Sequence, residues 1–131
     1  LILPVKGKIS GIYGSRRILN GRPRRPHLGL DIAAPAGTKV IASADGVVTL
    51  AEKDLYFTGG TVIVDHGHGL STVYSHLRSL FVGVGDRVTQ GQTIGLVGST
   101  GRSTGPHLDW RVNWFQTRLD PMLFVNLNRN K

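Results

Sequence analysis

The sequence contains no cysteine, and this absence removes several kinds of protein at once. A disulfide scaffold, a zinc site built on thiolates and a thiol nucleophile all require cysteine. Acidic residues are also few, because 8 Asp and Glu stand against 16 Lys and Arg, for a net charge of +8. No stretch approaches the roughly 20 apolar residues of a membrane span. The chain is therefore predicted to lack a span and to favour anionic partners such as nucleic acid, acidic lipid or a wall polymer.

Helical periodicity is missing as well, whereas short β-rich runs separated by glycine and proline are frequent. The predicted strands fall at 39–51 (around the turn Asp45-Gly46), 61–65, 70–76, 93–97 and 107–115. One helical turn is predicted within 119–128. This pattern predicts an all-β fold, a compact barrel or sandwich with little helix. The similar phrases at 45–51 and 85–91 suggest two related halves.

The length of 131 residues fits one domain, predicted to occupy 1–131 with its core at about 4–125. The chain opens on Leu1 in the middle of a pattern, so we expect a processed product or a domain excised from a longer precursor.

Two pairs of residues have the types and spacing of metal ligands. His27 and Asp31 stand four apart and point to one side of an extended segment, and imidazole with carboxylate suits zinc. His107 and Asp109 stand two apart on a predicted strand, so they share one face while Leu108 and Trp110 pack behind. Each pair alone is also typical of an ordinary polar strand.

The other three histidines are less specific. His76 ends an alternating run, where a single histidine is more often structural than catalytic. His66 and His68 lie in a segment interpreted as a turn between strands, where an imidazole commonly caps backbone groups. Neither is predicted to be a ligand.

Three phrases together carry a stronger signal than any single residue. They are HLGLDIAAPAGTKVIASADGVV, GGTVIVDHGHGLSTVYSHL and VGDRVTQGQTIGLVGSTGRSTGPHLDWRV. In this order and spacing, residues 4–125 resemble the LytM/lysostaphin-type zinc endopeptidases of bacterial cell walls. The resemblance implies a β-fold of the duplicated barrel type with an open groove and one Zn²⁺ per chain. It further implies cleavage of peptidoglycan stem peptides and a periplasmic, cell-envelope or extracellular location.

The resemblance also implies roles for particular residues. His27 and Asp31 match the first two zinc ligands, and His76 and His107 match the two catalytic histidines. The third ligand position, a histidine in the family, holds Asp109. The implied chemistry is metal-assisted amide hydrolysis, in which His107 or His76 removes a proton from the attacking water. Because the Asp109 side chain is short, recruitment of His107 as a ligand is the alternative.

Asp109 leaves several outcomes open. Two carboxylates and one histidine would lower the formal charge of a zinc site from +1 to neutral, so bound water would be less acidic. A weaker enzyme, a site for Mn²⁺, or a degenerate domain that binds cell wall or activates a partner hydrolase are the resulting alternatives.

Three further residues are candidates for substrate contact. Tyr13 is a candidate oxyanion donor, and Arg16 and Arg102 are candidate contacts for anionic stem peptides. A biotinyl or lipoyl carrier is disfavoured, because no lysine stands in a matching hairpin turn. Nucleic-acid binding is also disfavoured, because the basic segment has no interleaved aromatic residues.

Overall fold

Strands are the main secondary structure of the chain, for which a computed structural model describes residues 1–11, 18–19, 22–23, 29–101, 105–115 and 117–125. The strands are β1 (Lys8–Gly11), β2 (Ile18–Leu19), β3 (Arg22–Pro23), β4 (Leu30–Ala33), β5 (Lys39–Ile41), β6 (Gly46–Leu55), β7 (Gly59–Gly67), β8 (Leu70–Leu80), β9 (Arg87–Val88), β10 (Thr93–Val97), β11 (His107–Trp114) and β12 (Thr117–Leu119). A single 3₁₀ turn, η1 (Pro121–Phe124), falls within the predicted helical segment. Strand accounts for 57% and helix for 3%, so the all-β prediction is confirmed.

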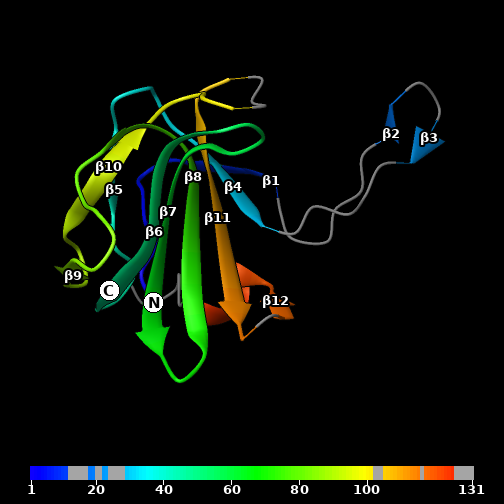
Figure 1. The fold of residues 1–131 in the computed structure, drawn as a ribbon. Helices are drawn as coiled ribbons and strands as arrows, with labels where there is room; N and C mark the ends of the chain where they lie inside the picture. The colour runs from blue at the N-terminus through cyan, green and yellow to red at the C-terminus, as the bar shows by residue number, and fades with distance from the viewer. Residues whose placement is uncertain (12–17, 20–21, 24–28, 102–104, 116, 126–131) are drawn as a thin grey trace.

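Ten of the described strands are joined into one unclosed sheet, and β2 and β3 pair with each other in a separate two-stranded sheet. Among the described residues, its main path runs β1-β4-β11-β8-β7-β6-β9, with β10 bridging β5 and β8 and β12 pairing with β11. All of these pairings are antiparallel. Strand β11 therefore lies between β4 and β8, as Figure 1 shows, and brings together two strands that are far apart in the sequence.

The two similar phrases in the sequence meet in space. Strand β6 begins in the first phrase and pairs with β9 of the second, Gly46 opposite Val88 and Val47 opposite Arg87. The backbone N–H of Gln90 donates to the carboxylate of Asp45, which ties the two turns together.

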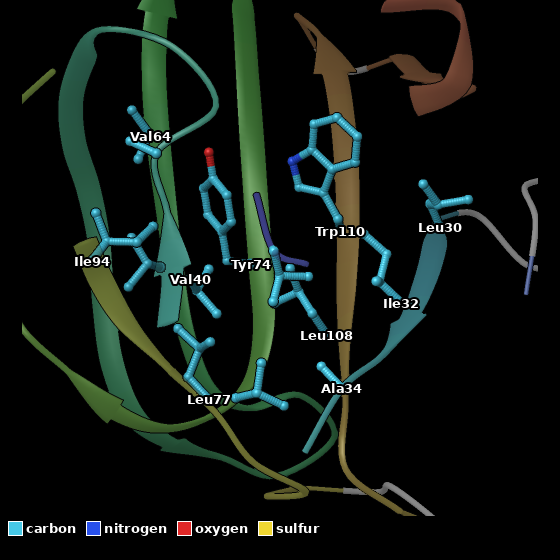
Figure 2. Packing of buried hydrophobic residues seen from close by; sticks show 14 of the residues in the cluster. Leu30, Ile32, Ala34, Val40, Val64, Tyr74, Leu77, Ile94, Leu108 and Trp110 are labelled. Atoms are coloured by element: carbon cyan, nitrogen blue, oxygen red, sulfur yellow. The ribbon is translucent and has the colours of Figure 1, made fainter. Parts of the chain in front are cut away.

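The core fills the inner side of the sheet and supports the strands that carry the candidate site. Leu108 and Trp110 of β11 and Tyr74 and Leu77 of β8 are 0–1% exposed and point into the same cluster, as Figure 2 shows. The alternation predicted for 107–110 is confirmed, because Leu108 and Trp110 pack inward as their spacing requires. Such packing holds β8 and β11 in a fixed relation.

Among the described residues, no helix is long and apolar enough to cross a membrane.

Candidate active site

The predicted site residues divide into those that the structure describes and those that it does not. Asp31, His76, His107 and Asp109 are described and lie on β4, β8 and β11. The remaining four fall outside the described residues: Tyr13, Arg16, His27 and Arg102. The predicted open groove would be lined by segments that contain these four residues, so it also lies partly outside the described residues. The site is therefore built here from the three adjacent strands.

Two carboxylates face each other across the pairing of β4 with β11. Asp31 is the direct partner of Asp109, and the two residues are 7% and 5% exposed. Like charges directly opposite each other destabilise a sheet, and burial increases the cost. A cation close to both is therefore needed.

Arg111 supplies that cation. Its Nε donates to Asp109 Oδ1 at 3.0 Å and its Nη2 to Oδ2 at 2.9 Å, which is a two-pronged ion pair. The Arg111 side chain is 24% exposed and that of Asp109 is 7% exposed. Burial acts to lower the pKa of Arg111, but the hydrogen bonds and charge of Asp109 and the charge of Asp31 raise it above its ordinary value. Arg111 thus stays charged and compensates Asp109.

Gly29 provides the space for this ion pair. A Cβ placed on Gly29 would lie 2.5 Å from Asp109 Oδ1 and 2.8 Å from Arg111 Cγ, both well inside contact distance. Residue 29 stands two positions before Asp31, so any side chain there would share the face of Asp31. The glycine of the HLGLD phrase therefore allows the Arg111 side chain to lie over β4 and reach back to Asp109.

His107 begins β11 beside Asp31. Its Nδ1 lies 2.8 Å from the carbonyl oxygen of Gly105, and its Nε2 lies 3.8 Å from Asp31 Oδ1. Because a carbonyl only accepts, Nδ1 must carry the hydrogen. In the neutral ring the lone pair is then on Nε2, the nitrogen that faces Asp31.

His76 is held from several sides in an unusual backbone conformation. Its φ is 66°, in the left-handed region that a non-glycine residue seldom occupies and that costs about 1–3 kcal/mol. Its backbone N–H donates to the Thr58 carbonyl at 2.7 Å, and its Nδ1 donates to the Thr100 carbonyl at 2.6 Å. Such strain, held in place by neighbouring loops, is typical of functional sites.

The two imidazoles are close neighbours. Their ring centroids are 4.9 Å apart, and the planes are inclined by 47°. Both rings are anchored through Nδ1 to a backbone carbonyl, which fixes the orientation of each. The structure thus places His107 beside both His76 and Asp31, and it places Asp109 opposite Asp31 across the strand pairing.

Sequence analysis missed four residues that shape the site. Arg111 and Gly29 hold Asp109, and Thr58 and Thr100 hold His76. The spacing of Arg111 two positions after Asp109 on a strand was the available signal, because it places both side chains on one face. The two threonines act through backbone carbonyls, for which the sequence carries no signal.

The segment around His66 differs from its prediction. His66 lies inside β7 rather than in the turn. Its Nδ1 donates at 2.8 Å to the carbonyl of Asp45, the residue directly before β6. The strand continues to Gly67 because β7 pairs with β8 as far as Leu70. His68 does occupy the turn, with a φ of 55°. A surface depression of about 520 Å³ lies beside His66, Asp65 and Arg87, away from His76 and His107.

Two anchored imidazoles beside a buried carboxylate on an antiparallel sheet are groups that can accept and donate protons. The model of peptidase family M23 matches residues 25–121, so the chain belongs to peptidase family M23. The predicted resemblance is thereby confirmed.

Individual relatives agree with this assignment. The peptidoglycan DD-endopeptidase ShyA of Vibrio cholerae is 43% identical over 108 residues, which are 82% of this chain and 25% of ShyA. A zinc-containing peptidase from Vibrio cholerae has a similar structure, with a TM-score of 0.84 and 34% identity over 92% of this chain and 38% of that one. The catalytic domain of lysostaphin from Staphylococcus simulans gives 0.79 and 35% identity, over 90% and 91%. The chain spans about a quarter of the length of the curated relatives it matches.

Proposed function

We propose that residues 1–131 form one metal-dependent peptidase domain that hydrolyses peptide cross-links of bacterial peptidoglycan. The observation that carries the proposal is the pair of anchored imidazoles, 4.9 Å apart, beside the buried carboxylate of Asp31. Family membership and relatives that are peptidoglycan endopeptidases support the substrate class. A periplasmic, cell-envelope or extracellular location is proposed, because peptidoglycan lies there.

The cofactor proposed is one zinc ion per chain, held by His27 and Asp31. Asp31 and His107 fit zinc, which accepts carboxylate oxygen and imidazole nitrogen. The hydrogen bond from His107 Nδ1 to Gly105 is the outer contact that a ligating histidine usually makes. Asp109, the third ligand that the sequence predicts, has both oxygens bound to Arg111 as described. The third ligand is therefore either Asp109 or His107.

Zinc in such a site supplies Lewis-acid polarisation of a carbonyl and an acidified water. The proton chemistry belongs to the chain. His76 has its hydrogen on Nδ1 and a lone pair on Nε2. We propose that Nε2 accepts a proton from the water that attacks the peptide carbonyl. Once protonated, its imidazolium is suited to protonate the leaving amine or stabilise the oxyanion. The sequence pattern also makes His107 a candidate to accept this proton.

The basic character of the chain suits an anionic substrate. A net charge of +8 attracts polymers that bear carboxylates, as stem peptides do. Arg16 and Arg102 are proposed to contact those carboxylates, and Tyr13 is proposed to donate to the developing oxyanion.

Digestion of purified peptidoglycan tests the proposal. The zinc-supplemented chain is incubated with sacculi, and the fragments are separated and weighed by mass spectrometry. We expect cross-linked fragments to be converted to monomers, and Asp31→Asn and His76→Ala to abolish this conversion. Asp54→Asn, an exposed change on β6, serves as the control for loss of one negative charge. Binding of sacculi without any cleavage would instead support a degenerate wall-binding domain.

A further inference from the structure

Arg78 on β8 is an exposed cation that the proposed proton chemistry does not use. The residue before it, Leu77, is buried in the core, so the alternation of the strand directs the Arg78 side chain to the opposite face. Within the described part of the chain, no ion pair joins Arg78 to a carboxylate. Its charge is therefore available to an anion from solution.

Gly98 places the base of the Arg78 side chain beside both site histidines. The backbone N–H of Gly98 donates to the His76 carbonyl at 3.1 Å, and the Gly98 carbonyl accepts from the His107 backbone N–H at 3.2 Å. A Cβ on Gly98 would lie 2.6 Å from Arg78 Cβ and 2.8 Å from Arg78 N, so only glycine permits this approach. Arg78 thus packs against a residue that is hydrogen-bonded to the backbone of both histidines.

The guanidinium of Arg78 lies over the turn 35–38 between β4 and β5. A Cβ on Gly37 would be 3.8 Å from Arg78 Nη1 and 3.9 Å from Arg78 Cζ, which is ordinary contact distance. This turn follows the end of β4 at Ala33, the residue that pairs with His107. The guanidinium therefore lies at the same end of the sheet as His107. The turn reads Pro-Ala-Gly-Thr and has no charged side chain to neutralise it.

An arginine in this position suits a carboxylate of the substrate. The guanidinium carries five N–H donors in a planar fork, and this fork matches the two oxygens of a carboxylate. Stem peptides bear carboxylates, and the net charge of +8 favours their approach to the chain.

We infer that Arg78 binds a free carboxylate of the substrate peptide and is a specificity-determining residue of the peptidase. This inference rests on the proposed function. The carboxylate has two possible sources, the C-terminus of a stem peptide and a carboxylate within the stem. Arg78 acts in binding, whereas the proton chemistry stays with the histidines.

Steady-state kinetics of the 131-residue chain on synthetic cross-linked peptides test the inference. The peptides have all carboxylates free, only the C-terminal one amidated, only those within the stem amidated, or all amidated. For the peptide with free carboxylates, we expect Arg78→Gln to raise KM about tenfold, the effect of losing a hydrogen bond to a charged group. The kcat should stay nearly unchanged, because the contact is the same in the bound substrate and in the transition state.

Arg87→Gln is the matched control. Arg87 is an exposed arginine on β9 that borders the depression beside His66, away from His76 and His107. Its loss should leave KM unchanged for every peptide. The partly amidated peptide on which Arg78→Gln no longer raises KM identifies the carboxylate that Arg78 binds. An equal rise for the fully amidated peptide, an equal rise in Arg87→Gln, or no rise in Arg78→Gln would overturn the inference.

Binding measurements separate this inference from the proposed function. Fluorescence anisotropy of labelled versions of the same peptides gives Kd without turnover. An unaltered chain that cleaves none of the peptides would refute the proposed function. Binding that is about tenfold weaker in Arg78→Gln, and only for free carboxylates, would still support the contact, and unchanged binding would overturn it.

A second variant covers the case in which circular dichroism shows that Arg78→Gln has not folded. Arg78→Lys keeps the charge but loses the planar fork. It should raise KM less than Arg78→Gln, and only for peptides with the free carboxylate. No rise in this variant would then overturn the inference.

Discussion

Strand β8 contributes to two polar clusters that use the same residue types in different ways. Near its start, Thr72 Oγ1 lies 2.8 Å from His66 Nε2 and 2.7 Å from the Tyr74 hydroxyl, which accepts from the Ser43 backbone N–H at 3.1 Å. Both nitrogens of His66 are engaged, because Nδ1 bonds the Asp45 carbonyl. Two residues beyond Tyr74, His76 is anchored through one ring nitrogen, by the hydrogen bond from Nδ1 to the Thr100 carbonyl.

The difference teaches how to separate a structural imidazole from a reactive one. A ring whose two nitrogens are both bonded inside the fold has no atom left for a substrate. A ring fixed by one nitrogen has a defined orientation and an unused lone pair. Removing the first should therefore cost stability, and removing the second should cost catalysis.

The largest expected effect is that of His76→Ala. Loss of a positioned proton carrier should lower the rate of peptidoglycan cleavage by about 10²–10⁴-fold. The melting temperature should fall only modestly, because alanine keeps the Cβ that strains the backbone at φ 66° and the change removes one hydrogen bond, from Nδ1 to the Thr100 carbonyl. The matched change His66→Ala should do the opposite, lowering the melting temperature and keeping most activity. Equal losses of activity in both variants would refute the distinction.

Gly29→Ala is expected to have the next largest effect, on stability. The added Cβ would overlap Asp109 Oδ1 and Arg111 Cγ and displace the ion pair, at a cost of about 1–3 kcal/mol in the free energy of unfolding. Gly83→Ala is the control, since a Cβ there has nothing within 4 Å. Urea denaturation of both variants measures the difference, and equal midpoints would show that the pair has no need of Gly29.

Tyr74→Phe tests the closed cluster directly. Loss of the hydroxyl leaves the Ser43 backbone N–H and the Thr72 hydroxyl without this buried partner, so we expect a loss of about 1–2 kcal/mol. Tyr56→Phe, on a side chain that is 70% exposed, should change stability much less. Denaturation curves with unchanged slopes would assign the loss to the native state.

The smallest effect concerns pH. Burial lowers the pKa of His66 below 6.5, although the Asp45 carbonyl and nearby carboxylates act in the other direction. The folded state therefore binds this proton less readily than the unfolded state. Its contribution to stability is complete above pH 6.5 and is lost as the pH falls through the folded-state pKa. Melting temperatures from pH 7.5 to 5 should fall less steeply in His66→Gln than in the unaltered chain.

Much of the strand pattern follows from local sequence. The run 93–97 is strand β10 with the same bounds, and β5 and β6 are separate strands on either side of the break that ends at Asp45. Strand β8 extends four residues beyond the predicted 70–76, because Leu77 to Leu80 pair with β10. Local patterns cannot show such a partner. Nor could they show that β5 pairs with β10 rather than with its neighbour β6.

The sequence by itself determined the all-β fold, the family and the candidate residues. Residue type, alternation and spacing are local properties, and three separated motifs show them in the order typical of the family. Only the tertiary structure decided what those residues contact. The approach of β4 to β11 sets Asp31 opposite Asp109, and the absent side chain of Gly29 lets Arg111 bind the latter. That contact depends on shape and charge across strands far apart in the chain, and such information exists only once the sheet has formed.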